Sequence, residues 1–175
     1  MTIEPVPGPV LTGRLVRLRP VEAADHARLD AILREPSVAR WWTPPDEAGP
    51  AADWLADEGQ VSLVIEHDGV VVGSIQFVEV VDPNYRTASI DLFISTAAQG
   101  RGLGPDAIRA VARHLFEARD QHHLTIDPSA ANDRAIRAYQ KVGFRPVGVM
   151  RAYERGADGS WHDNLLMDLL LGELT

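Results

Sequence analysis

Hydrophobic residues alternate with polar ones in several stretches of this chain. Apolar and β-branched runs of this kind predict strands at 14–19, 62–66, 70–80 and 87–95. His67-Asp68-Gly69 separates two of these runs, and Asp-Gly supplies the positive φ angles that a tight hairpin turn requires. An antiparallel hairpin is therefore expected around this tripeptide.

Helical spacing of apolar residues, at steps of three and four, predicts helices at 23–33, 48–57, 102–119 and 132–142. The pattern is clearest in the third of these, where Leu103, Val111 and Leu115 fall on one face. Asn132 is suited to cap the last helix, and Gly143 can end it in a left-handed conformation. A loop is expected after Trp42, because Pro44 and Pro45 lack amide donors.

Short apolar runs at 124–126, 147–153 and 165–170 complete the predicted strands. The order of strands and helices predicts an α/β (α+β) protein in which helices pack on a mixed sheet. With 175 residues, one domain at 11–172 is expected, preceded by a loose, proline-rich arm at 1–10.

The charge balance and the lack of cysteine restrict the function classes. Lys and Arg total 17 against 25 Asp and Glu, a net charge of −8 that disfavours nucleic acid as a partner. Without cysteine there are no disulfides, thiolate nucleophiles or thiolate metal ligands. The histidines show no metal-ligand spacing, so no metal cofactor is expected.

The hydrophobic and charge pattern of the sequence also predicts no targeting signal and no membrane span. The first ten residues have no basic stretch followed by an apolar run, and no window approaches the roughly 18 apolar residues of a membrane span. A cytoplasmic protein with no membrane partner is expected. Its oligomeric state stays open between a monomer and a homodimer.

A glycine-rich segment, Gln99-Gly100-Arg101-Gly102-Leu103-Gly104, lies between a predicted strand and the longest predicted helix. Glycines let the backbone approach an anion, and the unpaired amides of a first helical turn favour negative charge. The Arg101 guanidinium can add a charge-assisted contact, whereas Pro105 removes one amide donor. The segment predicts a phosphate site, although a plain tight turn explains the same glycines.

These residues resemble a known family. Residues 99–104 are similar to the Gln/Arg-x-x-Gly-x-Gly/Ala pyrophosphate loop of the GNAT superfamily of N-acetyltransferases, and 132–144 to its later motif, an Asn followed by Ala-x-x-x-Tyr-x-x-x-Gly-Phe. Within the superfamily, three further stretches resemble the aminoglycoside 6'-N-acetyltransferases: Arg40-Trp41-Trp42, Ile90-Asp91 and Thr125-Ile126-Asp127-Pro128-Ser129. The resemblance implies a GNAT fold, with a mixed, mostly antiparallel sheet of six to seven strands flanked by about four helices. It also implies acetyl-coenzyme A as cosubstrate.

The resemblance assigns roles to individual residues. Asp91 would contact the substrate amine and act as its base, and Tyr139 would protonate the departing coenzyme sulfur. The cofactor-binding residues it implies are Phe93, Ile94, Gln99, Gly100, Arg101, Gly102, Leu103, Gly104, Asn132 and Tyr139. The implied substrate-binding residues are Trp41, Trp42, Gln76, Asp91 and Asp127.

Each of these side chains also has an explanation without chemistry. Asp91 has an ordinary pKa of about 3.9, which makes a weak base unless burial raises it, and it can equally be a polar residue at a strand edge. Tyr139 can be a core aromatic, Asn132 only a helix cap, and Asp127 an Asx-turn residue. Adjacent tryptophans point in different directions, so one of the pair is expected in the core.

The predicted function is acetylation of a primary amine of an aminoglycoside, at the 6' position by resemblance, by direct transfer in a ternary complex. The substrate would be a small, polycationic amine. Two alternatives remain: a GNAT acyltransferase acting on a siderophore lysine or a polyamine, and a non-catalytic module that binds coenzyme A.

Overall fold

The computed structural model describes residues 8–42, 59–156 and 158–175. Eight strands form one sheet in the order β1-β2-β3-β4-β5-β6-β8-β7. They are β1 (Leu11–Thr12), β2 (Arg17–Pro20), β3 (Gln60–His67), β4 (Val70–Val80), β5 (Thr87–Ile94), β6 (His123–Ile126), β7 (Arg145–Arg155) and β8 (Trp161–Leu170). The helices in the described ranges are η1 (Ala23–Asp25), α1 (His26–Leu33), α2 (Pro36–Ala39), η2 (Thr96–Ala98), α4 (Leu103–Glu117) and α5 (Asp133–Gln140).

The expected α/β fold is confirmed, including the hairpin of β3 and β4, but the sheet has eight strands where six to seven were expected. The additional strand, β1, pairs with β2 through two residues and is too short to show a hydrophobic period. Helix α2 was also missed, and Pro36 begins it where a missing amide hydrogen costs nothing. The helix expected at 48–57, the loop at 43–47 and most of the arm at 1–10 lie outside the described residues.

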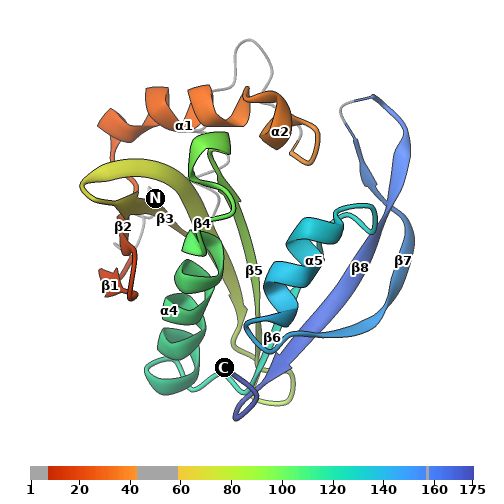
Figure 1. Ribbon diagram of the computed structural model, residues 1–175. Helices are drawn as coiled ribbons and strands as arrows, with labels where there is room; N and C mark the ends of the chain where they lie inside the picture. Colours follow the sequence, from red (N-terminus) through yellow and green to blue (C-terminus); the bar gives the residue numbers. More distant parts are fainter. Residues whose placement is uncertain (1–7, 43–58, 157) are drawn as a thin grey trace, which may run out of the picture.

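Helices cover both faces of the sheet, so its central strands are buried on both sides. On β3, Leu63 and Ile65 pack into the core that contains α4 and α5, while Val64 between them packs against α1 and α2. Figure 1 shows α1 and α2 crossing one end of the sheet, with α4 and α5 on either side of β5 in this view. Two layers of helix around one sheet explain the near-continuous apolar runs.

The sheet opens in the middle, at the parallel pair of β5 and β6. These strands pair only at Ala88 with Leu124 and Ser89 with Thr125, although β5 continues to Ile94. Beyond this point they separate, and in Figure 1 β5 and β8 form the two arms of a V. Helix α4 connects the two parallel strands, so the carboxyl ends of both lie at the open end.

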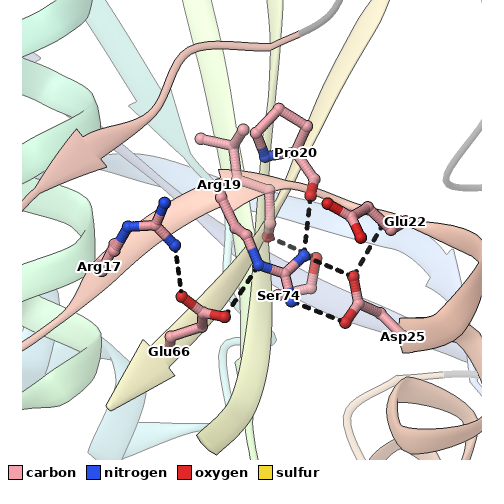
Figure 2. Close-up of polar contacts among 8 residues, drawn as sticks. Arg17, Arg19, Pro20, Glu22, Asp25, Glu66 and Ser74 are labelled. Carbon is pink, nitrogen blue, oxygen red and sulfur yellow. Dashed lines mark hydrogen bonds and ion pairs between the residues drawn. The ribbon is translucent and has the colours of Figure 1, made fainter. Parts of the chain in front are cut away.

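A network of charges fixes the entry into α1 (Figure 2). Arg19 on β2 donates to both carboxylate oxygens of Asp25, at 2.7 and 2.9 Å, and its Nε donates to Glu66 on β3 at 2.8 Å. Hydrogen bonding to Arg19 holds the pKa of Asp25 below its usual value, against the effect of burial. The network ties β2, β3 and η1 together, and so sets the direction in which α1 and α2 leave the sheet.

A second carboxylate joins the N-terminal loop to the start of α4. Asp106 is buried and accepts hydrogen bonds from the amides of Arg14, Leu15 and Val16, at 3.0, 2.7 and 3.1 Å. A carboxylate that accepts several backbone N–H groups replaces its lost hydration. The loop is thereby held beside the first turn of α4.

Candidate active site

A cavity of about 1270 Å³ lies where β5 and β6 part. Its walls come from α2, β5, α4, the segment after β6, α5 and the hairpin of β7 and β8. It brings together most of the predicted site residues: Trp41, Trp42, Asp91, Phe93, Ile94, Gln99, Gly100, Gly102, Leu103, Gly104, Asp127, Asn132 and Tyr139. Gln76 and Arg101, also predicted, are not among its lining residues.

Two aspartates face the cavity from the diverging strands. Ser89 on β5 is the register partner of Thr125 on β6, so Asp91 and Asp127 occupy equivalent positions beyond the last pair. Side chains two residues apart on a strand lie on the same face. The parallel register therefore directs both carboxylates into the same opening.

Burial changes the protonation of this pair. Asp91 is exposed to solvent because it faces the open cavity, although the cavity walls lie around it. Desolvation, with the negative charges of Asp127 and Glu154, raises the pKa of Asp91 to about 7, against a hydrogen bond from the Leu92 amide. Burial also raises the pKa of Asp127, and the Asn164 amide opposes that change. A carboxylate with a pKa near 7 can accept a proton at neutral pH.

Tyr139 lies on α5 with 9% of its surface exposed, lines the same cavity and packs against Phe144. Desolvation and the charges of Asp91 and Asp127 raise the pKa of its hydroxyl. The hydroxyl therefore stays protonated at neutral pH and can act as a proton donor. The side chain is packed in the core and also borders the cavity, and its role as proton donor stays a prediction.

The start of α4 has the properties of an anion site. Gly102 is its N-cap with a φ of 79°, and no side chain caps the helix there. The amides of the first turn are therefore not taken up by a capping side chain, and the helix dipole favours negative charge beside them. By contrast, the Asn132 side chain caps α5 by accepting from the Ala135 amide at 3.2 Å, which confirms the predicted cap.

The long side chains of the glycine-rich loop, Gln99 and Arg101, contact other parts of the protein. Gln99 Nε2 donates to the carbonyl of Ile94 at 2.8 Å, and its Oε1 accepts from Arg134 on α5. Arg101, expected at the phosphates, lies with its Nη2 3.0 Å from Nε2 of His67. The loop therefore presents backbone to the cavity, while its long side chains hold it in place.

Basic residues line the helical side of the cavity: Arg14, Arg109, Arg134, Arg137 and Lys141. They come from the N-terminal loop, α4, α5 and the residue directly after α5, and one acid, Asp106, also lies on α4, where its carboxylate accepts from backbone amides. The other acids lie at the sheet: Asp91 on β5, Glu154 on β7, and Asp127 directly after β6. The cavity is thus positive near the helices and negative at the strands. Such a division suits two ligands of opposite charge.

The paired tryptophans border the cavity on another side. Trp42 packs edge-on against Phe93, with ring centroids 5.2 Å apart, in the smaller core cluster. The Arg40 guanidinium lies 4.5 Å from the centroid of the Trp41 ring and occupies one face of it. The two tryptophans differ in packing as expected, but Trp42 is only partly buried and packs against the smaller core cluster.

Several lining residues could not be predicted from the sequence, and the predicted Gln76 lies outside the lining. Glu154 on β7 and Asn164 on β8 both border the cavity. Gln76 instead sits beside Asp91 in the ladder of β4 and β5, and its Oε1 accepts from Gln60 at 3.1 Å. A helical or alternating period carries no signal for Glu154, because β7 bulges just before it.

The chain is similar to known acetyltransferases. The model of the acetyltransferase (GNAT) domain matches residues 15–145. This chain belongs to the GNAT acetyltransferase family. It is 30% identical to spermidine N(1)-acetyltransferase of Escherichia coli, over 76% of this chain and 74% of that protein. It is also 30% identical to aminoglycoside N(6')-acetyltransferase type 1 of Klebsiella pneumoniae, over 77% and 76% respectively.

Solved structures agree with the family. A crystal structure of an aminoglycoside acetyltransferase in complex with coenzyme A and kanamycin superimposes on this GNAT acetyltransferase with a TM-score of 0.73. The two are 27% identical, and the match covers 89% of this chain and 95% of that one. The relatives thus include enzymes named for two different polycationic amines at equal sequence identity.

In the described parts of this GNAT acetyltransferase, none of the helices is long and apolar enough to cross a membrane. Within the same ranges, no group of three or more His, Cys, Asp or Glu side chains is placed to hold a metal ion.

Proposed function

We propose that this GNAT acetyltransferase transfers acetyl from acetyl-coenzyme A to a primary amine of a polycationic small molecule, with an aminoglycoside as the first candidate. The observation that carries the proposal is the pair of cavity carboxylates, Asp91 and Asp127, opposite a basic wall that ends at an uncapped helix. The carboxylates suit a polyamine, and the basic wall suits the phosphates of the coenzyme.

The residues at the start of α4 fit the coenzyme. The first-turn amides behind Gly102 would receive the pyrophosphate, while Arg134 and Arg137 of α5 lie along the same wall. Acetyl-coenzyme A supplies an acetyl thioester when bound. Pro105, in the first turn of α4, has no amide hydrogen, so this phosphate site has one donor fewer than a helix start without proline.

Asp91 would accept a proton and Tyr139 would donate one during the transfer. As the new carbon–nitrogen bond forms and the carbon–sulfur bond breaks, the amine loses a proton to Asp91 and the leaving sulfur gains one from Tyr139. The raised pKa of Asp91 makes it a competent acceptor, and the raised pKa of Tyr139 keeps its proton available. No covalent intermediate with the protein is needed.

A polyamine is the second candidate substrate. The equal identity to a spermidine acetyltransferase supports it, and so does the acidity of the strand side of the cavity, which fits any chain of ammonium groups. Trp41 favours the aminoglycoside, because its ring face can lie against a sugar.

An amine panel tests the proposal. Release of the coenzyme thiol from acetyl-coenzyme A would be followed with kanamycin, tobramycin, spermidine and a siderophore-type lysine derivative, using a known acetyltransferase as positive control. We expect turnover with kanamycin and tobramycin, and acetylation at the 6' nitrogen when the product is analysed by NMR. Turnover with spermidine alone would select the second candidate. Binding of coenzyme A without turnover of any amine would contradict catalysis.

A further inference from the structure

The hairpin of β7 and β8 contains a bulge beside the cavity. Met150 pairs with Asn164 and Glu154 pairs with His162, so β7 carries more residues than β8 between the two pairs. Ala152, within the bulge, has a φ of 49°, and its amide donates to Asp163 Oδ1 at 2.8 Å. A left-handed alanine is unfavourable and often marks a functional position.

The bulge changes where Glu154 points. An extra length of strand reorients the side chains that follow it, and β7 is otherwise almost wholly exposed. Glu154 is half-buried and lines the cavity, and its charge acts on Asp91. The acidic side of the cavity therefore has a third carboxylate, from a strand at the edge of the sheet.

Asn164 connects this carboxylate to Asp127. It is 3% exposed, and its Nδ2 lies 3.2 Å from Asp127 Oδ2, 3.2 Å from Glu154 Oε2 and 2.9 Å from the Asp127 carbonyl. A neutral donor shared by two carboxylates lowers their mutual repulsion. In this orientation the buried Asn164 side-chain oxygen is left without a hydrogen-bond partner among the described residues.

The backbone does not need this side chain to hold the strands together. The Leu165 amide donates to the Pro128 carbonyl at 2.9 Å, and the Ala130 amide donates to the Asp163 carbonyl at 2.8 Å. These bonds tie the segment after β6 to β8 whatever residue stands at position 164. Besides its bond to the Asp127 carbonyl, the Asn164 amide contacts the two carboxylates.

We propose that Asn164 is a positioning residue that holds Asp127 and Glu154 side by side, and that the two carboxylates together bind an ammonium group of the substrate other than the one acetylated. The inference rests on the proposed amine acetylation at Asp91 and adds a specificity element to it. Asn164 touches neither substrate nor coenzyme in this role, but acts through its two acidic partners.

Matched amines separate this role from a structural one. Hexamethylenediamine and hexylamine differ by a single terminal amine, and only the first can use a second ammonium site. We expect Asn164→Leu to lower kcat/KM for hexamethylenediamine by about tenfold, mainly through KM, and to leave that for hexylamine within about twofold. The same substitution at an exposed turn residue outside the cavity, Asn84→Leu, should change neither value.

A double-mutant cycle tests whether Asn164 acts through Glu154. In a Glu154→Gln background, Asn164→Leu should lose most of its effect on hexamethylenediamine, because the pair is already broken. An equal fall for both amines, or an undiminished effect in that background, overturns the inference. If Asn164→Leu fails to fold, as judged by melting temperature and coenzyme A binding, Asn164→Ser replaces it under the same criteria.

Failure of the proposed function gives a different result. If the wild type acetylates neither amine, catalysis fails, and the positioning role is then read from calorimetry of both amines with the protein bound to coenzyme A. Tighter binding of the diamine that Asn164→Leu abolishes supports the role. Equal binding of the two amines by the wild type overturns it.

Discussion

At the scale of single residues, the carboxyl group of Asp91 combines two properties that normally exclude each other. The surrounding protein and the nearby negative charges disfavour its ionised form, yet it must be ionised to accept a proton. Its raised pKa of about 7 brings both forms into the physiological range. Removing its charge should therefore lower the activity and raise the stability of the folded protein.

Removal of the Asp91 charge should abolish most of the activity. Asp91→Asn cannot accept a proton, so we expect kcat to fall by about 100-fold or more. In the wild type, kcat/KM should rise with pH and level off above about pH 7, because the base is protonated below that value. Steady-state rates across pH test both points, and a wild-type profile that is flat through neutrality would contradict the assignment.

The same variant should be more stable than the wild type in alkaline solution. A raised pKa in the folded state means that the stabilising contribution of Asp91 is complete below its unfolded value of 3.8 and is lost as pH rises through about 7. The melting temperature of Asp91→Asn should therefore exceed that of the wild type by more at about pH 8 than at about pH 4. An equal difference at both pH values would mean that Asp91 is not desolvated.

Tyr139→Phe removes only the proposed proton donor and keeps the ring in its packed position. We expect kcat to fall by about 10- to 100-fold while coenzyme affinity and the KM for the amine stay unchanged. Tyr85→Phe, at a tyrosine 74% exposed in the turn before β5, is the matched control. An unchanged kcat would leave Tyr139 as a packing residue alone.

At the scale of secondary-structure elements, the start of α4 relies on backbone more than on side chains. Gly102 takes a positive φ as N-cap, and Gly104 lies so close to β5 that an added Cβ would come within 3.3 Å of Ile94 Cδ1. The helix end is thus seated against the strand that carries Asp91. This contact places the anion site and the proton acceptor at a fixed separation.

Pro105→Ala should strengthen coenzyme binding, because it restores an amide hydrogen in the first turn. A hydrogen bond to a charged group contributes about 1.5–3 kcal/mol, so the Kd for coenzyme A should fall by about tenfold or more. Calorimetry with coenzyme A measures the change, with Pro146→Ala, at an exposed proline of β7, as control. An unchanged Kd would mean that this position does not face the phosphates.

The elements that show a clear period could be predicted from the sequence, and so could Asp91 and Asp127 once the resemblance was seen. Glu154 and Asn164 could not, since a bulge directs the first and a register between distant strands places the second. Strand β1 and helix α2 were too short to show a pattern. The contact of Arg101 with His67 could not be predicted either, because only the folded sheet brings the two residues together.

At the scale of the whole molecule, the net charge of −8 describes the site poorly. The cavity is divided into an acidic side on the sheet and a basic side on the helices. A ligand therefore meets a local field that differs in sign from one wall to the other. The acidic side explains how a cation could be attracted, and the basic side how an anionic coenzyme enters an acidic protein.

Salt should weaken the binding of multiply charged amines more than that of a single amine. The Debye length falls from about 14 Å at 0.05 M to about 4 Å at 0.5 M, which screens the more distant carboxylates. We expect the KM for kanamycin or spermidine to rise several-fold over this range, and the KM for hexylamine to change little. Equal changes for all three amines would show that the acidic side of the cavity does not select by charge.

The clamp made by Asp106 has a consequence for folding. It joins residues up to 92 positions apart, so the first turn of α4 and the loop at 13–16 reach their final places only together. Contacts between such distant parts of a chain tend to form late, because closing long loops is entropically costly. A refolding chain should accordingly gain helix signal first and affinity for coenzyme A last.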